Sequence, residues 1–286
     1  MMDERYADLH IHTTYSDGLS SPASVVQRAV DLGLRAIAIT DHDSVGAIEP
    51  ALVAARGTDV EVIPGVELSV TIDDEDVHIL GYLIDCRHTG LLELLHRFAS
   101  ARLERARKIV AKLDTLGAPL EIDRVLELAG RGTVGRPHIA DALVESGWAR
   151  TFDDAFLRFI GYHAPAYVGK PRLDPALAFR LLRDAGGLSV LAHPGVEGRE
   201  RFLPQLKEAD LDGIEVWHTQ HDRRTVARLS ERAREMGLLM TGGSDCHGER
   251  RSEPLIGTVK VPYSVVGEMK QRRRDKGLTE LGDENR

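Results

Sequence analysis

Cysteine is nearly absent from the sequence, which has two, Cys86 and Cys246, among 286 residues. Two cysteines cannot form a disulfide framework, and neither lies in a CxxC pair, so zinc-finger and thioredoxin-like chemistry are excluded. Cys246 lies between Asp245 and His247, and we expect it to pack as a small side chain rather than to bind a metal.

Long apolar runs are missing as well. No uninterrupted apolar stretch approaches the ~18 residues that a membrane span needs, and the acidic start of the chain leaves no room for an apolar signal segment. With 42% hydrophobic and 29% charged residues, the composition is that of a globular protein. The sequence therefore predicts a cytoplasmic protein that does not associate with membranes.

Basic residues do not outnumber acidic ones. Lys and Arg number 37 and Asp and Glu 45, a net charge of −8, which argues against a protein that wraps duplex DNA by neutralising its phosphates. Aromatic residues make up 5%, too few for an extended base-stacking surface. A bound nucleotide would be held one or two bases at a time, and no obligate protein partner is indicated.

Strand-like and helical segments alternate along most of the chain. The strand-like segments are 36–40, 60–64, 77–84, 188–192, 213–217 and 238–241, and helical patterns include 174–185 and 222–236. This alternation is typical of an α/β protein with a parallel sheet or barrel. Segment 91–159 has helical patterns and no convincing strand. We therefore predict a β/α barrel formed by residues 1–98 and 165–286, with a small helical insertion over 99–164.

Histidines and carboxylates cluster at the carboxyl ends of the expected strands. In a β/α barrel these ends share one face, where active sites are built. His10 and His12 alternate along an extended segment, so both imidazoles point to the same side and can reach one cation. The candidate metal ligands are His10, His12, Asp17, His42, Glu67, His78, His193, Asp245 and His247.

Taken singly, some of these residues have ordinary explanations. Asp17 is equally an ordinary turn residue, and an isolated His78 would be a hydrogen-bonded core histidine. The presence of the other histidine and carboxylate clusters favours metal binding for both residues. The set exceeds what one tetrahedral zinc uses, so two or three divalent ions are expected, with Glu67 able to bridge two of them. Imidazole and carboxylate without thiolate suit manganese, iron or zinc, and we favour manganese.

Such a centre indicates hydrolysis. Divalent ions lower the pKa of bound water from 15.7 to about 7 and hold the attacking and leaving oxygens of a phosphoryl transfer. The residues that would carry the reaction are His10, His12, Glu67, His193 and Asp245. The same ions could activate water against a carbonyl, so an amidohydrolase stays an alternative, as does a metal-binding module without enzymatic activity.

A series of motifs in a fixed order resembles the PHP (polymerase and histidinol phosphatase) family. They are Asp8-Leu9-His10-Ile11-His12 with Ser16-Asp17-Gly18, Thr40-Asp41-His42, Gly65-Val66-Glu67, His78-Ile79-Leu80-Gly81, Ala192-His193-Pro194 and Gly243-Ser244-Asp245-Cys246-His247. The resemblance implies a distorted seven-stranded β/α barrel with a trinuclear metal centre. It also implies which ligands share an ion: His10, His12, Glu67 and Asp245 the first, Glu67, His78 and His193 the second, and Asp17, His42 and His247 the third.

Two motifs in and after the helical insertion narrow the resemblance. Gly135-Arg136-Pro137-His138-Ile139-Ala140 and Tyr167-Val168-Gly169-Lys170-Pro171 resemble a branch of stand-alone nucleotide phosphoesterases that includes 3′,5′-nucleotide bisphosphatases and 5′-to-3′ exoribonucleases. The resemblance implies a phosphatase that removes the 3′-phosphate of a 3′,5′-bisphosphorylated nucleotide, converting pAp to AMP and phosphate. Cleavage of short 5′-phosphorylated RNA is the alternative, and histidinol phosphate is a less favoured substrate.

Basic residues of the same region predict a pocket for phosphate. Arg136, His138, Lys170 and Arg172 would form it, with Arg199 a further candidate shortly after His193. Taken alone, several of these are as readily solvated surface residues. The basic run Arg97, Arg102, Arg105, Arg107, Lys108 and Lys112 is spread around an expected helix, and we predict a solvated face there.

Overall fold

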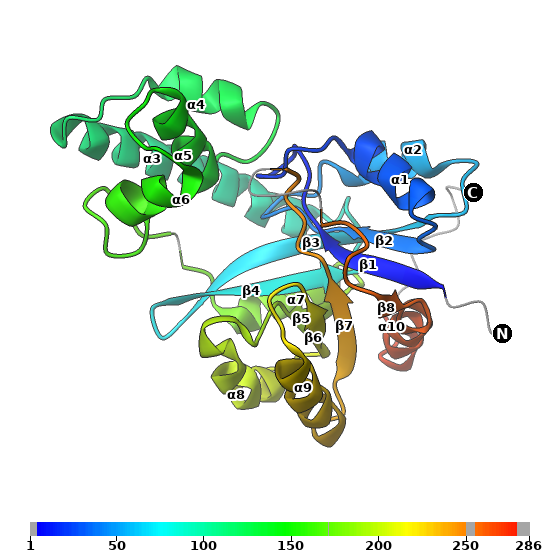
Figure 1. Cartoon of the computed structure of the whole chain (residues 1–286). Helices are drawn as coiled ribbons and strands as arrows, with labels where there is room; N and C mark the ends of the chain where they lie inside the picture. The colour runs from blue at the N-terminus through cyan, green and yellow to red at the C-terminus, as the bar shows by residue number, and fades with distance from the viewer. Residues whose placement is uncertain (1–4, 171, 250–254, 279–286) are drawn as a thin grey trace.

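The computed structural model describes residues 5–170, 172–249 and 255–278, so the first four residues of the acidic start and Pro171 lie outside the described residues. The described chain is a mixed α/β fold around a curved sheet (Figure 1). Its strands are β1 (Tyr6–Ile11), β2 (Ala36–Ile39), β3 (Glu61–Ile72), β4 (Glu75–Tyr82), β5 (Leu188–Leu191), β6 (Gly213–His218), β7 (Leu239–Gly243) and β8 (Val261–Pro262). Their order across the sheet is β7-β6-β5-β4-β3-β2-β1-β8.

The sheet curls until its two halves nearly meet. Within it β1, β2 and β3 run parallel, as do β5, β6 and β7. Ile11, at the end of β1, forms a parallel bridge with Cys246, just beyond β7, so the sheet is a nearly closed barrel at this end. The resemblance implies seven strands, whereas the described chain has eight, because the two-residue β8 adds an antiparallel edge beside β1.

Strand β4 departs from the parallel arrangement that the sequence pattern favours, since it pairs antiparallel with both β3 and β5. Asp73 and Asp74 form a two-residue turn between the paired residues Ile72 and Glu75. Both aspartates adopt positive φ angles, 48° and 65°, as a tight hairpin turn of the type I′ kind requires. A hairpin therefore stands where a helical crossover between parallel strands was expected.

Helices on the outside of the sheet begin where the sequence supplies a cap. α1 (Pro22–Asp31) follows Ser21, whose hydroxyl accepts a hydrogen bond from the Ser24 N–H at 3.1 Å. Asp174 and Asp222 cap α7 (Pro175–Asp184) and α9 (Arg223–Glu235) in the same way. The other helices of this layer are α2 (Ile48–Ala55), the 3₁₀ helix η2 (Val196–Phe202), α8 (Leu203–Glu208) and α10 (Ser264–Asp275).

A second set of helices, the helical group, lies beyond one end of the sheet (Figure 1). It consists of α3 (Thr89–Thr115), α4 (Ile122–Ala129), α5 (Arg136–Glu145), α6 (Phe152–Ala155) and the π-helical turn η1 (Phe156–Ile160). These helices bury a hydrophobic cluster of their own, which includes Ile109, Leu113 and Ile139. At its beginning, α3 packs Leu91 and Leu94 into the core of the sheet instead. The predicted boundary at residue 99 therefore falls inside one continuous helix.

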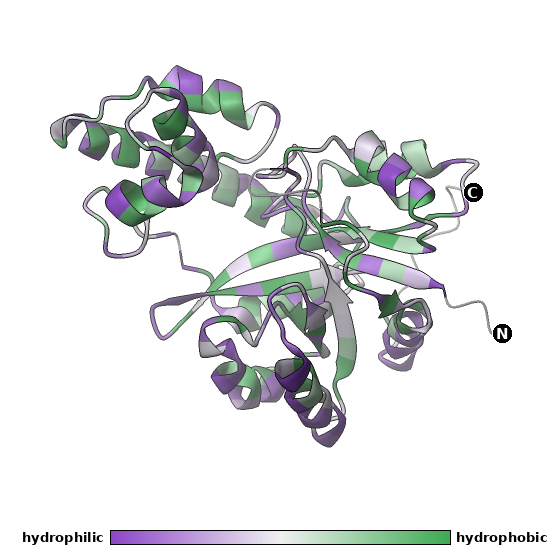
Figure 2. Ribbon diagram, in the orientation of Figure 1, coloured by the Kyte–Doolittle hydropathy of each residue, from purple (hydrophilic) through white to green (hydrophobic). Residues whose placement is uncertain are grey.

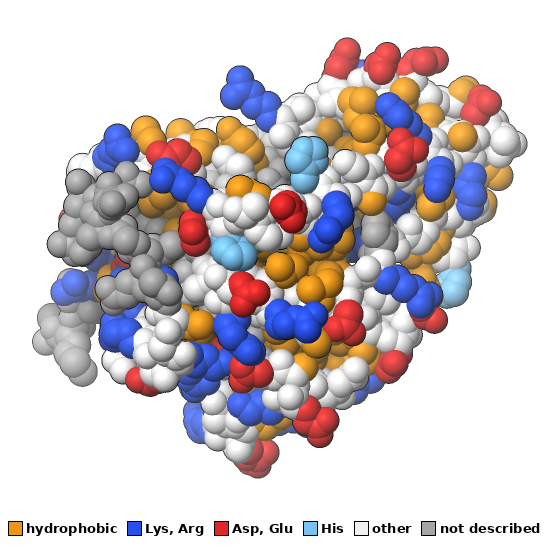
Figure 3. Space-filling model, turned by 180° about the vertical axis from the view of Figure 1, so that it is seen from behind, with side chains coloured by type: hydrophobic (Ala, Val, Ile, Leu, Met, Phe, Trp, Pro, Cys, Tyr) orange, Lys and Arg blue, Asp and Glu red, His pale blue; other side chains and the backbone are white. Residues whose placement is uncertain are grey.

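Hydrophobic residues concentrate along the strands, while many hydrophilic residues lie on the outer helices (Figure 2). Leu9, Ile11, Ile79 and Leu80, from β1 and β4, are each 0% exposed. Among the described residues, no helix is both long and apolar enough to cross a membrane. On the face turned away in Figure 1, the described acidic and basic side chains are intermixed rather than gathered into one basic surface (Figure 3).

Candidate metal centre

The first two candidate ligands lie in strand β1 and directly after it. His10 and His12 are 0% and 1% exposed, and their rings lie 5.2 Å apart because alternate residues of a strand face the same side. Their Nε2 atoms lie 3.2 and 3.1 Å from Oε2 of Glu67, and 3.4 and 3.1 Å from Oδ1 of Asp245. Ligand atoms of these four residues, which are far apart in the chain, therefore all lie within 4.8 Å of one another.

Glu67, at the middle of the cluster, is 1% exposed. Besides its contacts with the β1 histidines, its Oε2 lies 3.1 Å from Nδ1 of His42. Its Oε1 lies 2.9 Å from Nδ1 of His78 and 3.3 Å from Nε2 of His193. Each oxygen thus faces a different set of imidazoles, which is the arrangement that a carboxylate needs to bridge two cations.

A further group forms around Asp17. Nε2 of His247 lies 3.4 Å from Oδ1 of Asp17, and Nε2 of His42 lies 4.0 Å from Oδ2. The rings of His12 and His247 stack with centroids 4.1 Å apart. Ligand atoms of His12, Asp17, His42 and His247 lie within 4.8 Å of one another. The structure thus brings all the predicted metal ligands together at one end of the sheet.

The donor set fits divalent cations. Nε2 of His12, Nδ1 of His42 and both ring nitrogens of His78 are buried and lack a hydrogen-bond partner among the described residues. Leaving a buried polar group unpaired costs about 1–3 kcal/mol. Three of these nitrogens lie 2.9–3.1 Å from oxygens of Glu67 without hydrogen-bond geometry, an arrangement that a shared cation explains. Imidazole nitrogen with carboxylate oxygen is a suitable ligand set for manganese, iron or zinc.

The charges of the centre also favour cations. Burial lowers the pKa of both His42 and His78, which makes them neutral ligands at pH 7. Burial opposes the charged form of His12, but Asp245 and Glu67 outweigh it and raise its pKa to about 10. Burial also opposes ionisation of Glu67, yet the surrounding histidines hold its pKa well below its usual range. The ionised carboxylates thus draw positive charge into the centre, and divalent ions can supply it.

The loop after β7 is held against β1, which positions Asp245. Oδ1 of Asp8 accepts a hydrogen bond from the Ser244 N–H at 2.8 Å, and the Asp245 N–H donates to the His10 carbonyl at 2.9 Å. Gly243 packs so close to β1 that a Cβ atom there would lie 2.3 Å from the backbone nitrogen of His10. This approach requires glycine, because any side chain would displace the strand.

Two candidate ligands have strained backbone conformations. His193 and Asp245 adopt φ angles of 32° and 53°, positive values that residues other than glycine seldom take. Pro194 follows His193 and cannot donate to the sheet, so the chain leaves β5 at this point. Such strain persists only where surrounding contacts enforce it, and it concentrates at functional sites.

Asp41 holds the turn that carries Asp17. Its carboxylate, 0% exposed, accepts hydrogen bonds from the Thr13 N–H and hydroxyl at 2.7 Å each, and from the Ser16 hydroxyl at 2.6 Å. Asp41 therefore fixes the bend between β1 and Asp17. A residue that follows β2 thus positions a candidate ligand in the loop that follows β1.

Sequence analysis does not single out Glu215 and His218, two residues of β6 that lie at the centre. Oε1 of Glu215 lies 3.0 Å from Nδ1 of His10, and Oε2 accepts a hydrogen bond from the His193 N–H at 2.8 Å. Since Glu215 holds Nδ1 of His10, the Nε2 atom is left facing the cluster. Nε2 of His218 lies 3.4 Å from Oδ2 of Asp245. A glutamate inside an otherwise apolar strand was the available signal.

Arg136 and Lys170 lie beside the centre. Nζ of Lys170 is 3.3 Å from Oδ2 of Asp76 on β4. The Arg136 guanidinium lies over the rings of Phe156 and Tyr167, 5.5 and 5.6 Å from their centroids. Burial lowers the pKa of Lys170 to about 8 and also lowers that of Arg136. A bound anion would relieve the free-energy cost of burying these cations.

The prediction of a solvated basic face is wrong for two arginines of α3. Nε and Nη2 of Arg102 both donate to Oδ2 of Asp43, Nε at 2.9 Å. Arg105 is 6% exposed and donates through Nε to a backbone carbonyl at 2.7 Å. Burial, together with the repulsion of Arg136 and Arg102, lowers the pKa of Arg105 to about 10. The buried cations near Lys170 are thus more numerous than the sequence pattern predicts.

The other predicted substrate contacts lie in different places. His138 is 4% exposed, and its Nδ1 accepts a hydrogen bond at 3.0 Å from a backbone N–H at the start of its own helix. The side chain of Arg172 is 75% exposed and pairs with an aspartate of the β3–β4 turn. Arg199 donates to the carbonyl of Asp76 at 3.0 Å and lies 3.3 Å from Nδ1 of His193. Arg199 therefore contacts a candidate metal ligand, His193.

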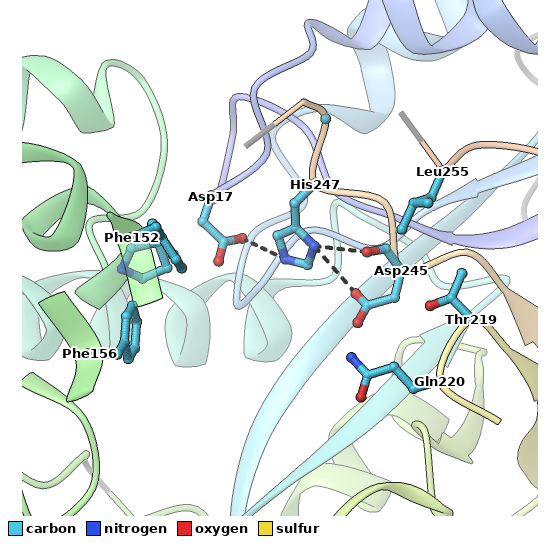
Figure 4. Close-up of a pocket in the computed structure, with 10 residues that line it drawn as sticks. Asp17, Phe152, Phe156, Thr219, Gln220, Asp245, His247 and Leu255 are labelled. Carbon is cyan, nitrogen blue, oxygen red and sulfur yellow. Dashed lines mark hydrogen bonds and ion pairs between the residues drawn. The ribbon is translucent and has the colours of Figure 1, made fainter. Parts of the chain in front are cut away.

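Two cavities open from the centre and share Gln220, Asp245 and His247. The larger, of about 300 Å³, extends from Asp17 toward the helical group (Figure 4). The smaller, of about 190 Å³, is lined in addition by His42, Glu67, His78, His193, Val196, Arg199 and His218. The centre is therefore accessible to a ligand from two sides.

Known proteins resemble this chain over most of its length. The PHP domain model matches residues 8–131. The 5′-3′ exoribonuclease Rnm of Escherichia coli (strain K12) is 34% identical over 257 residues, which cover 86% of this chain and 88% of the relative. The 3′,5′-nucleoside bisphosphate phosphatase of Chromobacterium violaceum is 32% identical, covering 84% and 86%. A crystal structure from Bifidobacterium adolescentis superposes with a TM-score of 0.86 at 32% identity, covering 94% and 96%.

A nearly closed α/β barrel whose strand ends gather imidazoles and carboxylates beside buried cations defines a metal-dependent phosphoesterase. The chain belongs to the PHP domain family, in agreement with the motifs along its sequence.

Proposed function

We propose that the protein hydrolyses the phosphate ester on the 3′ side of a nucleotide that also carries a 5′-phosphate, and that it converts pAp to AMP and phosphate. Strand β4 carries the main observation in support. Asp76 binds the side chains of Lys170 and Arg199, and His78, two residues further on, contacts Glu67. Cations that can hold a phosphate and ligands that can hold metals are thus joined through one strand.

The proposed metal centre follows the three groups of side chains. His10, His12, Glu67 and Asp245 would hold one ion, Glu67, His78 and His193 a second, and Asp17, His42 and His247 a third. Bound divalent ions, with manganese the proposed species, would supply positive charge and a water of lowered pKa. A barrel of seven strands, to which β8 adds an edge, and a helical insertion over 99–164 belong to the same proposal.

The remaining work falls to side chains of the protein. Glu215 keeps His10 turned toward the cluster, and Asp41 keeps the turn before Asp17 bent. Arg199 and Lys170 would donate charge-assisted hydrogen bonds to phosphate oxygens and offset the charge that develops there. Arg136 would bind the 5′-phosphate in a bidentate manner, which separates the anchor from the ester that is cleaved.

Removal of mononucleotides from short 5′-phosphorylated RNA is the second candidate function. The two cavities that share Asp245 and His247 favour it, because a phosphodiester has a chain on both sides of the phosphorus. The 34% identity to an exoribonuclease supports it equally. Both candidates need the same anchor for the 5′-phosphate.

The test is product identification by mass spectrometry after manganese-loaded protein is incubated with pAp or with a short 5′-phosphorylated RNA. AMP and phosphate from pAp would establish the phosphatase, and mononucleotides from RNA would establish the exoribonuclease. Histidinol phosphate and an amide substrate complete the panel. If the protein binds metal but cleaves neither nucleotide substrate, the nucleotide assignment is refuted.

A further inference from the structure

The larger cavity separates the metal centre from the helical group (Figure 4). One wall is formed by Asp17, Asp245 and His247, and the opposite wall includes Phe152 and Phe156. Metal binding uses the first wall and gives the second wall no role. The aromatic wall therefore calls for a separate explanation.

Phe152 and Phe156 line the cavity as a pair. They are four residues apart across the junction of α6 and η1, so they share one helical face, with ring centroids 5.1 Å apart. Both rings pack on the core of the helical group but remain partly exposed. A π-helical turn begins at Phe156, and such turns are frequent at functional sites. Apolar rings that line a cavity beside a charged centre indicate a ligand with an apolar face.

The surroundings of the aromatic wall narrow the class of ligand. The Arg136 guanidinium lies over the ring of Phe156, 5.5 Å from its centroid, so a ligand against the two rings would have this cation and the metal centre as neighbours. The neutral side chains of Thr219 and Gln220 also line the cavity (Figure 4). Among ligands that carry phosphate, a nucleotide offers a flat aromatic face together with groups that a hydroxyl and an amide can bind.

We propose that Phe152 and Phe156 form the stacking surface for the base of the nucleotide whose 3′-phosphate occupies the metal centre. This inference rests on the proposed function and adds how the substrate is selected. Every base has a flat π face, so stacking selects for the presence of a base rather than for its identity. Two rings suffice for one base, in keeping with the low aromatic content of the chain.

The direct test compares ligands that differ in the base alone. AMP is the product of the proposed reaction, so its binding can be measured without turnover. We expect wild-type protein loaded with manganese to bind AMP about tenfold more tightly than ribose 5-phosphate in a calorimetric titration. Equal affinities would overturn the stacking surface. In turnover, ribose 3,5-bisphosphate should show a KM about tenfold above that of pAp.

Variants locate the effect. Phe156→Leu keeps an apolar side chain but removes the ring, and it should weaken AMP binding about tenfold while leaving ribose 5-phosphate unchanged. Leu157→Ala is the matched control, because Leu157 is the next residue and is 83% exposed. It should leave both affinities as they are. If Phe156→Leu weakens both ligands equally, the ring acts through the shape of the wall and the stacking role is refuted.

Different results would refute the proposed reaction and the proposed stacking surface. If AMP binds through its base while neither pAp nor RNA is cleaved, the proposed reaction is refuted and the stacking surface stands. If pAp and its analogue without a base are hydrolysed with equal efficiency, the reaction stands and the stacking surface is overturned.

Discussion

The two regions that face each other across the larger cavity are built differently. At the barrel end, His10 is held by Glu215, and Asp245 is tied to the backbone of β1. In the helical group, Phe152 and Phe156 line the cavity from short helical segments and are held by packing. Hydrogen bonds fix the positions of individual atoms, whereas packing fixes the shape of a surface. In the proposed function, the comparison separates residues that would carry the reaction from residues that would select its substrate.

The largest effect should come from Glu67, which links two of the ligand groups. Glu67→Ala should lose bound metal and at least about 100-fold in kcat, because it removes the carboxylate that five imidazoles face. Metal content by mass spectrometry and kcat are measured on the same sample. Glu235→Ala, at an exposed position of α9, is the control. Normal turnover with wild-type metal content would contradict the central role of Glu67.

The next largest effect should come from Glu215. Its two oxygens serve two donors, Nδ1–H of His10 and the N–H of His193. Glu215→Gln leaves one acceptor and turns an NH₂ group toward the other donor, so His10 loses its orientation. We expect manganese affinity to fall about 10- to 100-fold in a calorimetric titration, with no change in Glu235→Gln. An unchanged affinity would mean that Glu215 contributes only to folding.

On the helical side, removal of Arg136 should act on binding. Arg136→Ala is expected to raise KM for pAp about tenfold at unchanged kcat, because a charge-assisted hydrogen bond to the 5′-phosphate is lost. Adenosine 3′-phosphate, which lacks the 5′-phosphate, should be unaffected. Arg107→Ala removes an exposed arginine of α3 and serves as control. An equal rise in KM for both substrates would rule out an anchor for the 5′-phosphate.

The smallest effect should appear as a pH dependence. Burial lowers the pKa of Lys170 from 10.5 to about 8, so its ammonium is charged below pH 8 and neutral above it. KM for pAp should therefore rise by up to about tenfold between pH 7 and 9, as this hydrogen bond to phosphate loses its charge. Lys170→Arg keeps the charge and should flatten the profile. A profile that is identical in the variant would exclude Lys170 as the titrating group.

The ligand positions could be predicted from the sequence because strand geometry is simple. Alternation along the extended chain of β1 and the residue after it puts His10 and His12 on one side. Parallel strands put their carboxyl ends on one face. This rule does not account for Glu67 and His78, because they lie inside strands β3 and β4, which pair antiparallel. Glu215 was missed for a physical reason: it lies in the interior of a strand, and only the tertiary fold shows that His10 and His193 are its partners. The one local sign is a glutamate inside an otherwise apolar strand, and it does not reveal these partners.

The inward arginines of α3 show a second limit. One apolar stripe along a helix predicts one buried face that packs on one core. The beginning of α3, however, packs against the sheet, and its end packs within the helical group. Arg102 and Arg105 lie between these two stretches, where neither apolar stripe defines an inside. The antiparallel direction of β4 could not be predicted either. Asp73 and Asp74 form the tight turn before this strand, but aspartate is common in loops of every kind.

The continuity of α3 has a consequence for substrate size. Its 27 residues span about 40 Å without a proline, so the helix is stiff. Its beginning packs in the core of the sheet and its end packs in the core of the helical group. A stiff helix of this kind fixes the spacing between the aromatic wall and the metal centre. The cavity between them therefore does not close around a bound ligand. The protein would then favour substrates in which the distance from the base of one nucleotide to its 3′-phosphate matches this fixed spacing.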